Sequence, residues 1–136
     1  MKLHTHPMKH ARGMTLLELT VVILVLLSLI SILFIGARAW KRGSDRAGCI
    51  MNIRNVQQGV RSYANLNSYT AGGTVAGWKA YVIGTGMFVE KTPACPGGGT
   101  YSYATDTVIP DVGVLALSCS LAAAPDNHAP TSYSDW

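Results

Sequence analysis

The feature that most constrains this 136-residue chain is an unbroken apolar run near its N-terminus, residues 19–37. The run contains no charged side chain, whereas Glu18 stands directly before it and Arg38 directly after it. A helix rises about 1.5 Å per residue, so such a run is about 30 Å long and matches the hydrocarbon core of a bilayer. The sequence therefore predicts one membrane-spanning helix at this position.

Glu18 is the unusual residue of this segment. A carboxylate placed in a membrane helix costs about 2.5–3.5 kcal/mol on insertion scales. A cation held nearby would offset that cost, because opposite charges attract strongly in a low-dielectric setting. We therefore expect Glu18 to meet a positive partner in the functional state.

A cleaved secretory signal is the alternative interpretation of the same region. Lys2, Lys9 and Arg12 supply a positive N-terminal segment, and residues 37–39 (Ala-Arg-Ala) loosely fit a cleavage pattern. The apolar run is longer than the usual stretch of about 7–15 residues in a signal, which favours a membrane span. Basic residues flank the run on both sides, so the charge rule alone does not orient it. Those that follow are Arg38, Lys41, Arg42 and Arg46.

The charge balance argues against a nucleic-acid partner. The net charge is +4, but three of the basic residues lie within the first thirteen positions. The remaining chain is nearly neutral, so no specific nucleic-acid binding is expected. One span leaves about 100 residues outside lipid, which is enough for a single small domain.

Helical periodicity continues beyond the apolar run. Five apolar residues recur at spacings of three and four, which places them on one stripe of a helix. They are Cys49, Ile53, Val56, Val60 and Tyr63. The polar residues of this stretch fall mostly off the stripe: Arg54, Asn55, Gln57, Gln58, Arg61 and Ser62. We predict one helix from about Thr15 to Ala64, with an amphipathic second half that needs a covering surface.

The C-terminal part of the chain, from residue 71 onward, is rich in Gly, Ser, Thr, Tyr and Pro. Residues 100–105 and 112–118 read as strands, and residues 78–83 fit either a short helix or a strand. Residues 122–136 show no periodicity and are expected to be irregular. The predicted fold class is α+β, in which the long N-terminal helix packs on a small antiparallel sheet.

Three cysteines remain to be placed. Cys95 and Cys119 flank the predicted hairpin, and a disulfide between them would close about 25 residues and contribute about 3 kcal/mol. Such a bond requires an oxidising compartment, which would place this domain across the membrane from the basic leader. Cys49 is expected to be a small buried residue of the helix stripe. A metal site is disfavoured because the cysteines are widely spaced, with His128 as the one nearby histidine.

The N-terminal motif resembles a known family. Residues 13–23, Gly-Met-Thr-Leu-Leu-Glu-Leu-Thr-Val-Val-Ile, are similar to the cleavage and methylation motif of type IV pilins and type II secretion pseudopilins, and the likeness covers about residues 9–35. It implies that a prepilin peptidase cuts between Gly13 and Met14 and that the new amino group of Met14 is methylated. It also implies that Glu18 pairs with the amino group of Met14 on a neighbouring subunit, so that a buried charge becomes a buried pair. Head-to-tail contacts of this kind do not close and generate a helical filament.

The resemblance also implies a domain organisation. Residues 1–13 would be a cytoplasmic leader, 14–37 the transmembrane and filament-core helix, 38–66 an amphipathic helix, and 67–136 a small β-rich periplasmic or extracellular domain. The expected partners are other copies of this chain or pilin-like subunits, the prepilin peptidase, an inner-membrane assembly platform and membrane lipid. The expected location is the bacterial inner membrane, followed by a filament in the periplasm or on the cell surface.

Other chemistry finds little support in the sequence. The turn at residues 95–101, Cys-Pro-Gly-Gly-Gly-Thr-Tyr, resembles a turn found in a group of bacterial pilin-like proteins. Its glycines lack the lysine of a phosphate-binding loop. No enzyme, cofactor or metal is expected, although pseudopilins of this layout often hold calcium in an acidic loop. The acidic loop residues here are Asp106, Asp111, Asp126 and Asp135. The alternative function is a single-span, membrane-anchored binding module that does not polymerise.

Overall fold

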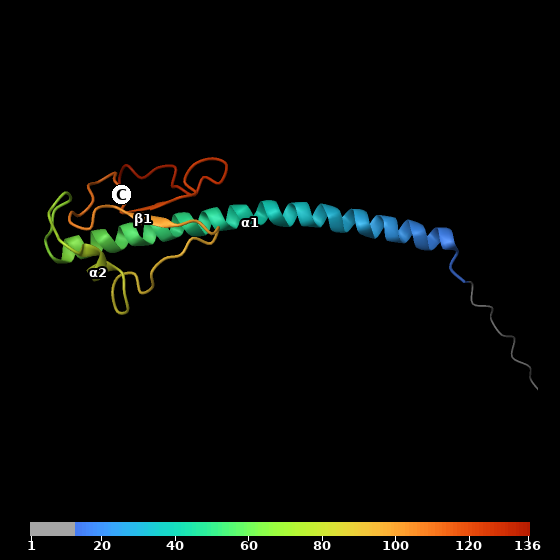
Figure 1. Ribbon diagram of the computed structural model, residues 1–136, viewed down its shortest axis with the longest axis horizontal. Helices are drawn as coiled ribbons and strands as arrows, with labels where there is room; N and C mark the ends of the chain where they lie inside the picture. Colours follow the sequence, from blue (N-terminus) through green and yellow to red (C-terminus); the bar gives the residue numbers. More distant parts are fainter. Residues whose placement is uncertain (1–12) are drawn as a thin grey trace, which may run out of the picture. The chain divides into compact units, whose positions relative to one another are not determined.

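A computed structural model describes residues 13–136 of the chain (Figure 1). In chain order its elements are helix α1 (Leu16–Leu66), helix α2 (Trp78–Val82), strand β1 (Tyr101–Tyr103) and strand β2 (Leu117–Cys119). The chain divides into two compact units, the first ending at Arg38 and the second covering Ala39–Trp136. A long N-terminal helix and a small antiparallel sheet confirm the α+β, pilin-like fold class predicted from the sequence.

Helix α1 ends at Leu66, close to the predicted end at Ala64. Asn67 donates to the Tyr63 carbonyl oxygen from its backbone nitrogen (3.2 Å) and from its side-chain Nδ2 (2.9 Å). Ser68 then takes a left-handed φ of 57°. These contacts satisfy a carbonyl group that the last helical turn leaves free, and they direct the chain out of the helix.

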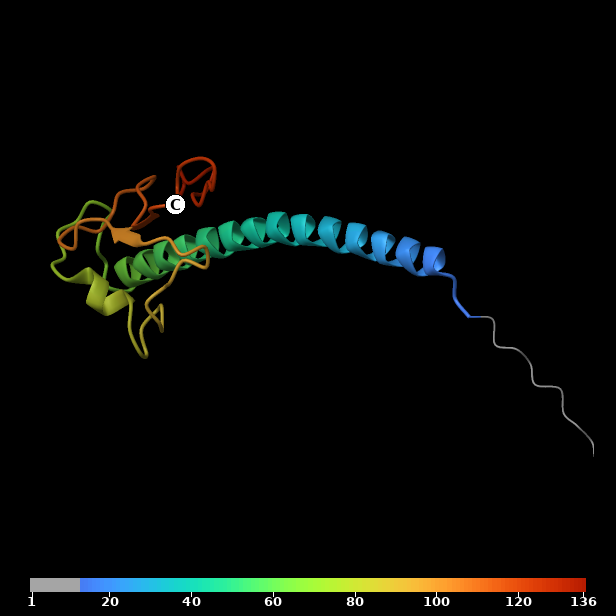
Figure 2. The same ribbon diagram turned by 45° about the vertical axis from the view of Figure 1, so that its right-hand side comes forward.

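The second half of α1 carries the core of the second unit. The chain that follows α1 lies along this half of the helix in both views (Figures 1 and 2). The predicted apolar stripe is buried, since Cys49, Ile53, Val56 and Val60 are at most 1% exposed. Tyr63 is partly buried and stacks on the ring of Tyr81 at 5.7 Å. The amphipathic pattern is therefore satisfied within the chain.

The sheet is smaller than the sequence predicted. Strands β1 and β2 pair antiparallel, with Tyr101 opposite Cys119 and Tyr103 opposite Leu117. Leu117 and Cys119 point inward and the intervening Ser118 is exposed. The predicted strand over residues 112–118 is not formed in its first part, because Gly113 takes a positive φ of 83° and Val114 returns a hydrogen bond to Asp111.

The buried side chain of Gln57 is a second reason why the first part of the predicted strand is not formed. We placed this residue off the apolar stripe, but it is 2% exposed. Its Oε1 accepts a hydrogen bond from the Ala116 backbone nitrogen at 2.8 Å, and its Nε2 donates to the Val114 carbonyl oxygen at 3.1 Å. The side-chain amide thus takes the place of a strand partner for residues 114–116, and its polar atoms are paired although they are buried.

Residues 78–83, which fitted either a helix or a strand, contain helix α2. Trp78 is fully buried, and its Nε1 donates to the Thr105 carbonyl oxygen at 3.0 Å.

The tail, residues 122–136, is irregular as predicted, yet it is held to the rest of the second unit by several contacts. The Trp136 carbonyl oxygen accepts hydrogen bonds from the Gly113 nitrogen (3.2 Å) and from Arg61 Nη2 (2.9 Å), and the Trp136 ring lies 5.5 Å from the guanidinium of Arg54.

Candidate functional site

The N-terminus of α1 is built around Glu18 and Thr15. The Thr15 backbone nitrogen and its Oγ1 donate to Glu18 Oε2 at 2.8 and 3.0 Å, and the Glu18 nitrogen donates back to Thr15 Oγ1 at 3.3 Å. This reciprocal arrangement is a capping box, in which two backbone donors at the helix start are satisfied. Glu18 therefore has a local structural role in addition to any partner outside the chain.

Sequence reasoning missed this role. We interpreted the Glu18 carboxylate only as a charge that needs a cation. The signal was present, because Thr15-Leu16-Leu17-Glu18 is a Ser/Thr-x-x-Glu pattern directly before an apolar run. The finding matters for experiments, since a substitution of Glu18 removes both a charge and a helix cap.

The expected cleavage site lies directly before the helix. Gly13 and Met14 have no helical structure, both are exposed, and no atom lies within 4 Å of the position a Cβ would take on Gly13. A protease can therefore reach this peptide bond without unfolding α1. The rest of the expected leader, residues 1–12, lies outside the described residues.

The apolar half of α1 has no cover among the described residues. Every large apolar side chain from Leu16 to Ile35 is between 46% and 81% exposed. The segment is long and apolar enough to cross a membrane. Its hydroxyls are satisfied by the helix itself, since Ser28 Oγ donates to the Val25 carbonyl and Ser31 Oγ to that of Leu27. Glu18 is thus its one charged group, as a single-pass membrane anchor permits.

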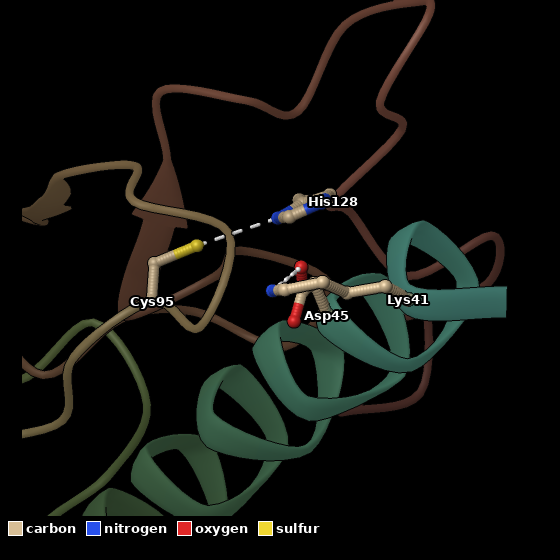
Figure 3. A network of polar contacts seen from close by, with 4 residues as sticks. All are labelled: Lys41, Asp45, Cys95 and His128. Carbon is tan, nitrogen blue, oxygen red and sulfur yellow. Dashed lines mark hydrogen bonds and ion pairs between the residues drawn. The ribbon is translucent and has the colours of Figure 1, made fainter. Parts of the chain in front are cut away.

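A basic stretch follows the apolar half. Four cationic residues lie within nine positions of α1: Arg38, Lys41 and Arg42 are exposed, and Arg46 is partly buried. Lys41 Nζ lies 2.8 Å from Asp45 Oδ2, one helical turn further along (Figure 3). Such a surface pair contributes little to stability. The stretch fits the headgroup layer at the end of a membrane span.

A second constellation joins residues that are far apart in the sequence. The three thiols of Cys49, Cys95 and Cys119 are free, and their Sγ atoms and a ring nitrogen of His128 all lie within 4.8 Å of one another. Cys95 Sγ is 3.7 Å from Cys119 Sγ. It is also 3.3 Å from His128 Nδ1, a contact shown in Figure 3. The structure thus brings together the two cysteines of the predicted disulfide, and it adds Cys49 and His128 to them.

We expected no metal site, because the cysteines are widely spaced in the sequence. The fold nevertheless collects one potential ligand from each of four separate segments. Among residues 13–136, this is the one group of three or more potential ligands that fits an ion, and it contains no carboxylate. Calcium prefers oxygen ligands, so this cluster gives no support to a calcium site.

The thiols of the cluster differ in acidity. Burial raises the pKa of the Cys49 thiol to about 12. Burial also acts on Cys95, but the contact with His128 and the backbone N–H groups of Gly99 and Gly97 outweigh it and lower the pKa of this thiol to about 7. Cys95 is therefore much more easily deprotonated than Cys49.

The remaining motifs are structural. Gly98, in the turn after Cys95, takes a positive φ of 81°, which is the tight turn expected after Pro96. His128 is 3% exposed and contacts thiols, so it is not placed to serve as a general base for a surface serine. Arg61 lines a cavity, and its terminal nitrogens Nη1 and Nη2 donate to the carbonyl oxygens of Pro110 and Asp111, respectively.

Comparisons of the chain with known protein families, with curated proteins and with solved structures found no match. The resemblance to pilins therefore rests on the motif at residues 13–23 and on the pilin-like arrangement of one long helix and a small sheet.

Proposed function

We propose that this chain is the structural subunit of a helical filament of the type IV pilus or secretion pseudopilus class. In this proposal, a prepilin peptidase cuts after Gly13, the amino group of Met14 is methylated, and the apolar half of α1 packs against other copies in the filament core. The chain would have no catalytic role of its own.

One observation carries the proposal: the apolar half of α1 is exposed along its whole length and begins with a carboxylate. Exposed apolar surface of this extent marks contact with a membrane or with other proteins. Lipid alone would cover the leucines and valines but would leave Glu18 without a cation. A filament of parallel helices supplies both an apolar cover and a cation, because the amino group of Met14 on one subunit meets Glu18 on the next.

The capping box refines this pairing. Before cleavage, Glu18 Oε2 accepts its hydrogen bonds from Thr15 of its own chain. A carboxylate has two oxygens and about four acceptor sites, so Oε1 stays available for an amine from outside. The helix cap would therefore hold the carboxylate in a fixed position at the helix end, where a neighbouring subunit can reach it.

Two substitutions separate charge from capping. Glu18→Gln removes the charge but keeps an oxygen that can close the capping box, which accepts Glu or Gln. Thr15→Ala removes the cap but keeps the charge. We expect Glu18→Gln to abolish filament formation and Thr15→Ala to leave most of it, as measured by the amount of this chain released from cells by mechanical shear.

Both variants should still be cleaved and remain in the membrane, which N-terminal mass analysis and membrane fractionation would check. The opposite result, with normal filaments from Glu18→Gln and few from Thr15→Ala, would show that the carboxylate serves only as a helix cap. The proposed pairing between subunits would then be wrong.

A membrane-anchored binding module is the second candidate, and the capping box is the observation that favours it. Because Thr15 already gives Glu18 a partner, a monomeric anchor would not need a neighbouring chain. This candidate predicts an N-terminus at Met1 and no effect of Glu18→Gln on function. An N-terminus at methylated Met14 would exclude it.

The orientation in the membrane belongs to the same proposal. With the leader in the cytoplasm, residues 67–136 would lie in the periplasm and later on the filament surface. We based this orientation on the predicted Cys95–Cys119 disulfide. The three thiols are free, so the support for it now comes from the pilin resemblance alone.

A further inference from the structure

Four buried side chains form a site that the filament function does not use. Cys49 comes from α1, Cys95 from the turn before β1, Cys119 from the end of β2 and His128 from the tail. They are 0%, 9%, 5% and 3% exposed, respectively. All four side chains are ordinary zinc ligands, and three thiolates with one imidazole are a common set for structural zinc.

Two of the distances between the ligand atoms match the edges of a tetrahedral zinc site. Zn–S bonds of about 2.3 Å and Zn–N bonds of about 2.0–2.1 Å give S–S edges of about 3.8 Å and S–N edges of about 3.5 Å. Here Cys95 Sγ lies 3.7 Å from Cys119 Sγ and 3.3 Å from His128 Nδ1, and all four ligand atoms fall within 4.8 Å. We propose that Cys49, Cys95, Cys119 and His128 bind one zinc ion as a structural site.

The glycines around Cys95 make room for this arrangement. A Cβ on Gly97 would come within 2.5 Å of His128 Cε1, and a Cβ on Gly99 within 2.9 Å of Cys119 Sγ. A Cβ on Gly48 would come within 3.0 Å of the Pro96 ring. Neither Gly97 nor Gly99 has a positive φ, so close approach to the ligands is what requires glycine there. The glycine turn is thus shaped to the cluster.

Hydrogen-bond donors also face the sulfur atoms. The Tyr101 hydroxyl donates to Cys49 Sγ at 3.3 Å and is itself positioned by Asn52 Nδ2 at 3.2 Å. The Leu121 backbone nitrogen lies 3.5 Å from Cys119 Sγ. Three thiolates and neutral histidine around Zn²⁺ carry a net charge of −1, and donors of this kind stabilise metal-bound thiolate.

A disulfide between Cys95 and Cys119 would account for less of the site. It would leave the buried Cys49 thiol and the His128 ring without a shared role, although both face the same point. Zinc engages all four groups. On binding, the thiols that are protonated lose their protons to the solvent, and no oxidant is needed. All four positions around the ion are filled by protein, which indicates a structural role and not a catalytic one.

Such an ion would tie the amphipathic half of α1 to β2 and to the tail. This inference does not depend on the proposed filament function, since it concerns the second unit only.

The test uses the full-length chain purified in detergent from cells grown with zinc. We expect one zinc per chain, three cysteines that react with an alkylating reagent after denaturation with a chelator, and a fall in the midpoint of thermal unfolding by about 10 °C or more on chelation.

Cobalt gives a direct readout of the ligands. Replacing zinc with Co²⁺ should produce the visible absorption of a tetrahedral ion and thiolate-to-metal charge-transfer bands. His128→Cys should still bind one ion per chain, with stronger charge-transfer bands from a fourth thiolate. His128→Ala should weaken binding at least tenfold. Asp126→Ala, an exposed change in the same tail, is the matched control and should bind like the wild type.

The proposal would be overturned by a Cys95–Cys119 disulfide in the purified folded chain, which mass spectrometry would detect as two cysteines protected from alkylation. It would also be overturned if wild-type chain equilibrated with Zn²⁺ or Co²⁺ under reducing conditions held less than a stoichiometric amount. The His128→Cys variant guards against misfolding, because a folded four-cysteine site that fails to bind the ion contradicts the proposal as well.

Discussion

The two halves of helix α1 have the same backbone structure but opposite surroundings. Between Leu16 and Ile35, the large apolar side chains are 46% to 81% exposed, whereas the stripe from Cys49 to Val60 is at most 1% exposed. The second half finds its cover within the chain, in the sheet, α2 and the tail. The first half finds none among the described residues, which is compatible with a single-pass membrane anchor.

The comparison shows how one helix can serve two environments. The first half is apolar on all sides, which suits a bilayer or a bundle of identical helices. The second half is apolar on one stripe only, which suits a single covering layer. The change occurs around the basic residues from Arg38 to Arg46, where the chain would leave the membrane.

Gly13 gives the largest expected effect. Under the proposed function, replacing it with a bulky residue such as Trp should block cleavage completely, because the peptidase would have to accept a large side chain directly before the bond that it cuts. The uncut chain would keep Met1 and lack the new amine that Glu18 needs. Mass spectrometry of the N-terminus should show only precursor, and shearing should release no filament. Cleaved chain from this variant would contradict the assignment of the cleavage site.

The second-largest expected effect compares how side chains from the two halves of α1 contribute to the free energy of unfolding. Ile53→Ala removes a side chain that is 1% exposed, and we expect the free energy of unfolding of the second unit to fall by about 2–5 kcal/mol. Ile32→Ala, at a position that is 66% exposed, is the matched control and should leave that free energy unchanged. Denaturant titration in detergent, followed by Trp fluorescence, would measure both. Equal losses would mean that the two halves do not differ in cover.

A substitution of Gln57 tests how much its buried hydrogen bonds contribute to stability. Gln57→Ala leaves the buried Ala116 nitrogen without its acceptor, so we expect a loss of about 1–3 kcal/mol in the same titration. Gln58, which is exposed and next in the chain, is the control, and Gln58→Ala should change stability by less than about 0.5 kcal/mol. A negligible loss for Gln57→Ala would show that water replaces the amide.

Two helix glycines give the smallest and most local contrast. Gly43 has no atom within 4 Å of its Cβ position, so Gly43→Ala should stabilise the chain by about 0.5–1 kcal/mol through helix propensity. Gly48 faces Pro96 at 3.0 Å, and Gly48→Ala should give less than this gain or a net loss. The midpoint of thermal unfolding would rank the two variants. Equal gains in stability would mean that the packing of the chain against α1 does not begin before Cys49.

Much of the fold was predictable because helical periodicity is strong in this chain. The apolar run and the stripe from Cys49 to Val60 predicted α1 nearly to its ends. The sheet was predicted less well. Strand propensity at residues 112–116 was overridden by a buried side chain, since Gln57 takes the hydrogen bonds that a neighbouring strand would have made. A local pattern gives no sign of such a contact from a distant helix.

The two candidate sites also differ in how well the sequence predicts them. Gly13, Met14 and Glu18 are adjacent in sequence, so a motif locates them. The cysteine–histidine cluster joins residues separated by up to 79 positions, and only the folded chain brings them together. Sequence reasoning considered Cys95 and Cys119 as a pair because they flank a hairpin, but it had no means of placing Cys49 and His128 beside them.

The most direct test of the account asks what covers the exposed half of α1 in cells. A photo-reactive amino acid at position 29, which is 52% exposed, should cross-link to a second copy of this chain in the wild type. The cross-link should disappear in the Glu18→Gln background. Cross-linked copies at equal yield in both backgrounds, or cross-links to lipid alone in the wild type, would contradict the claim that this half of the helix packs in a filament held by Glu18.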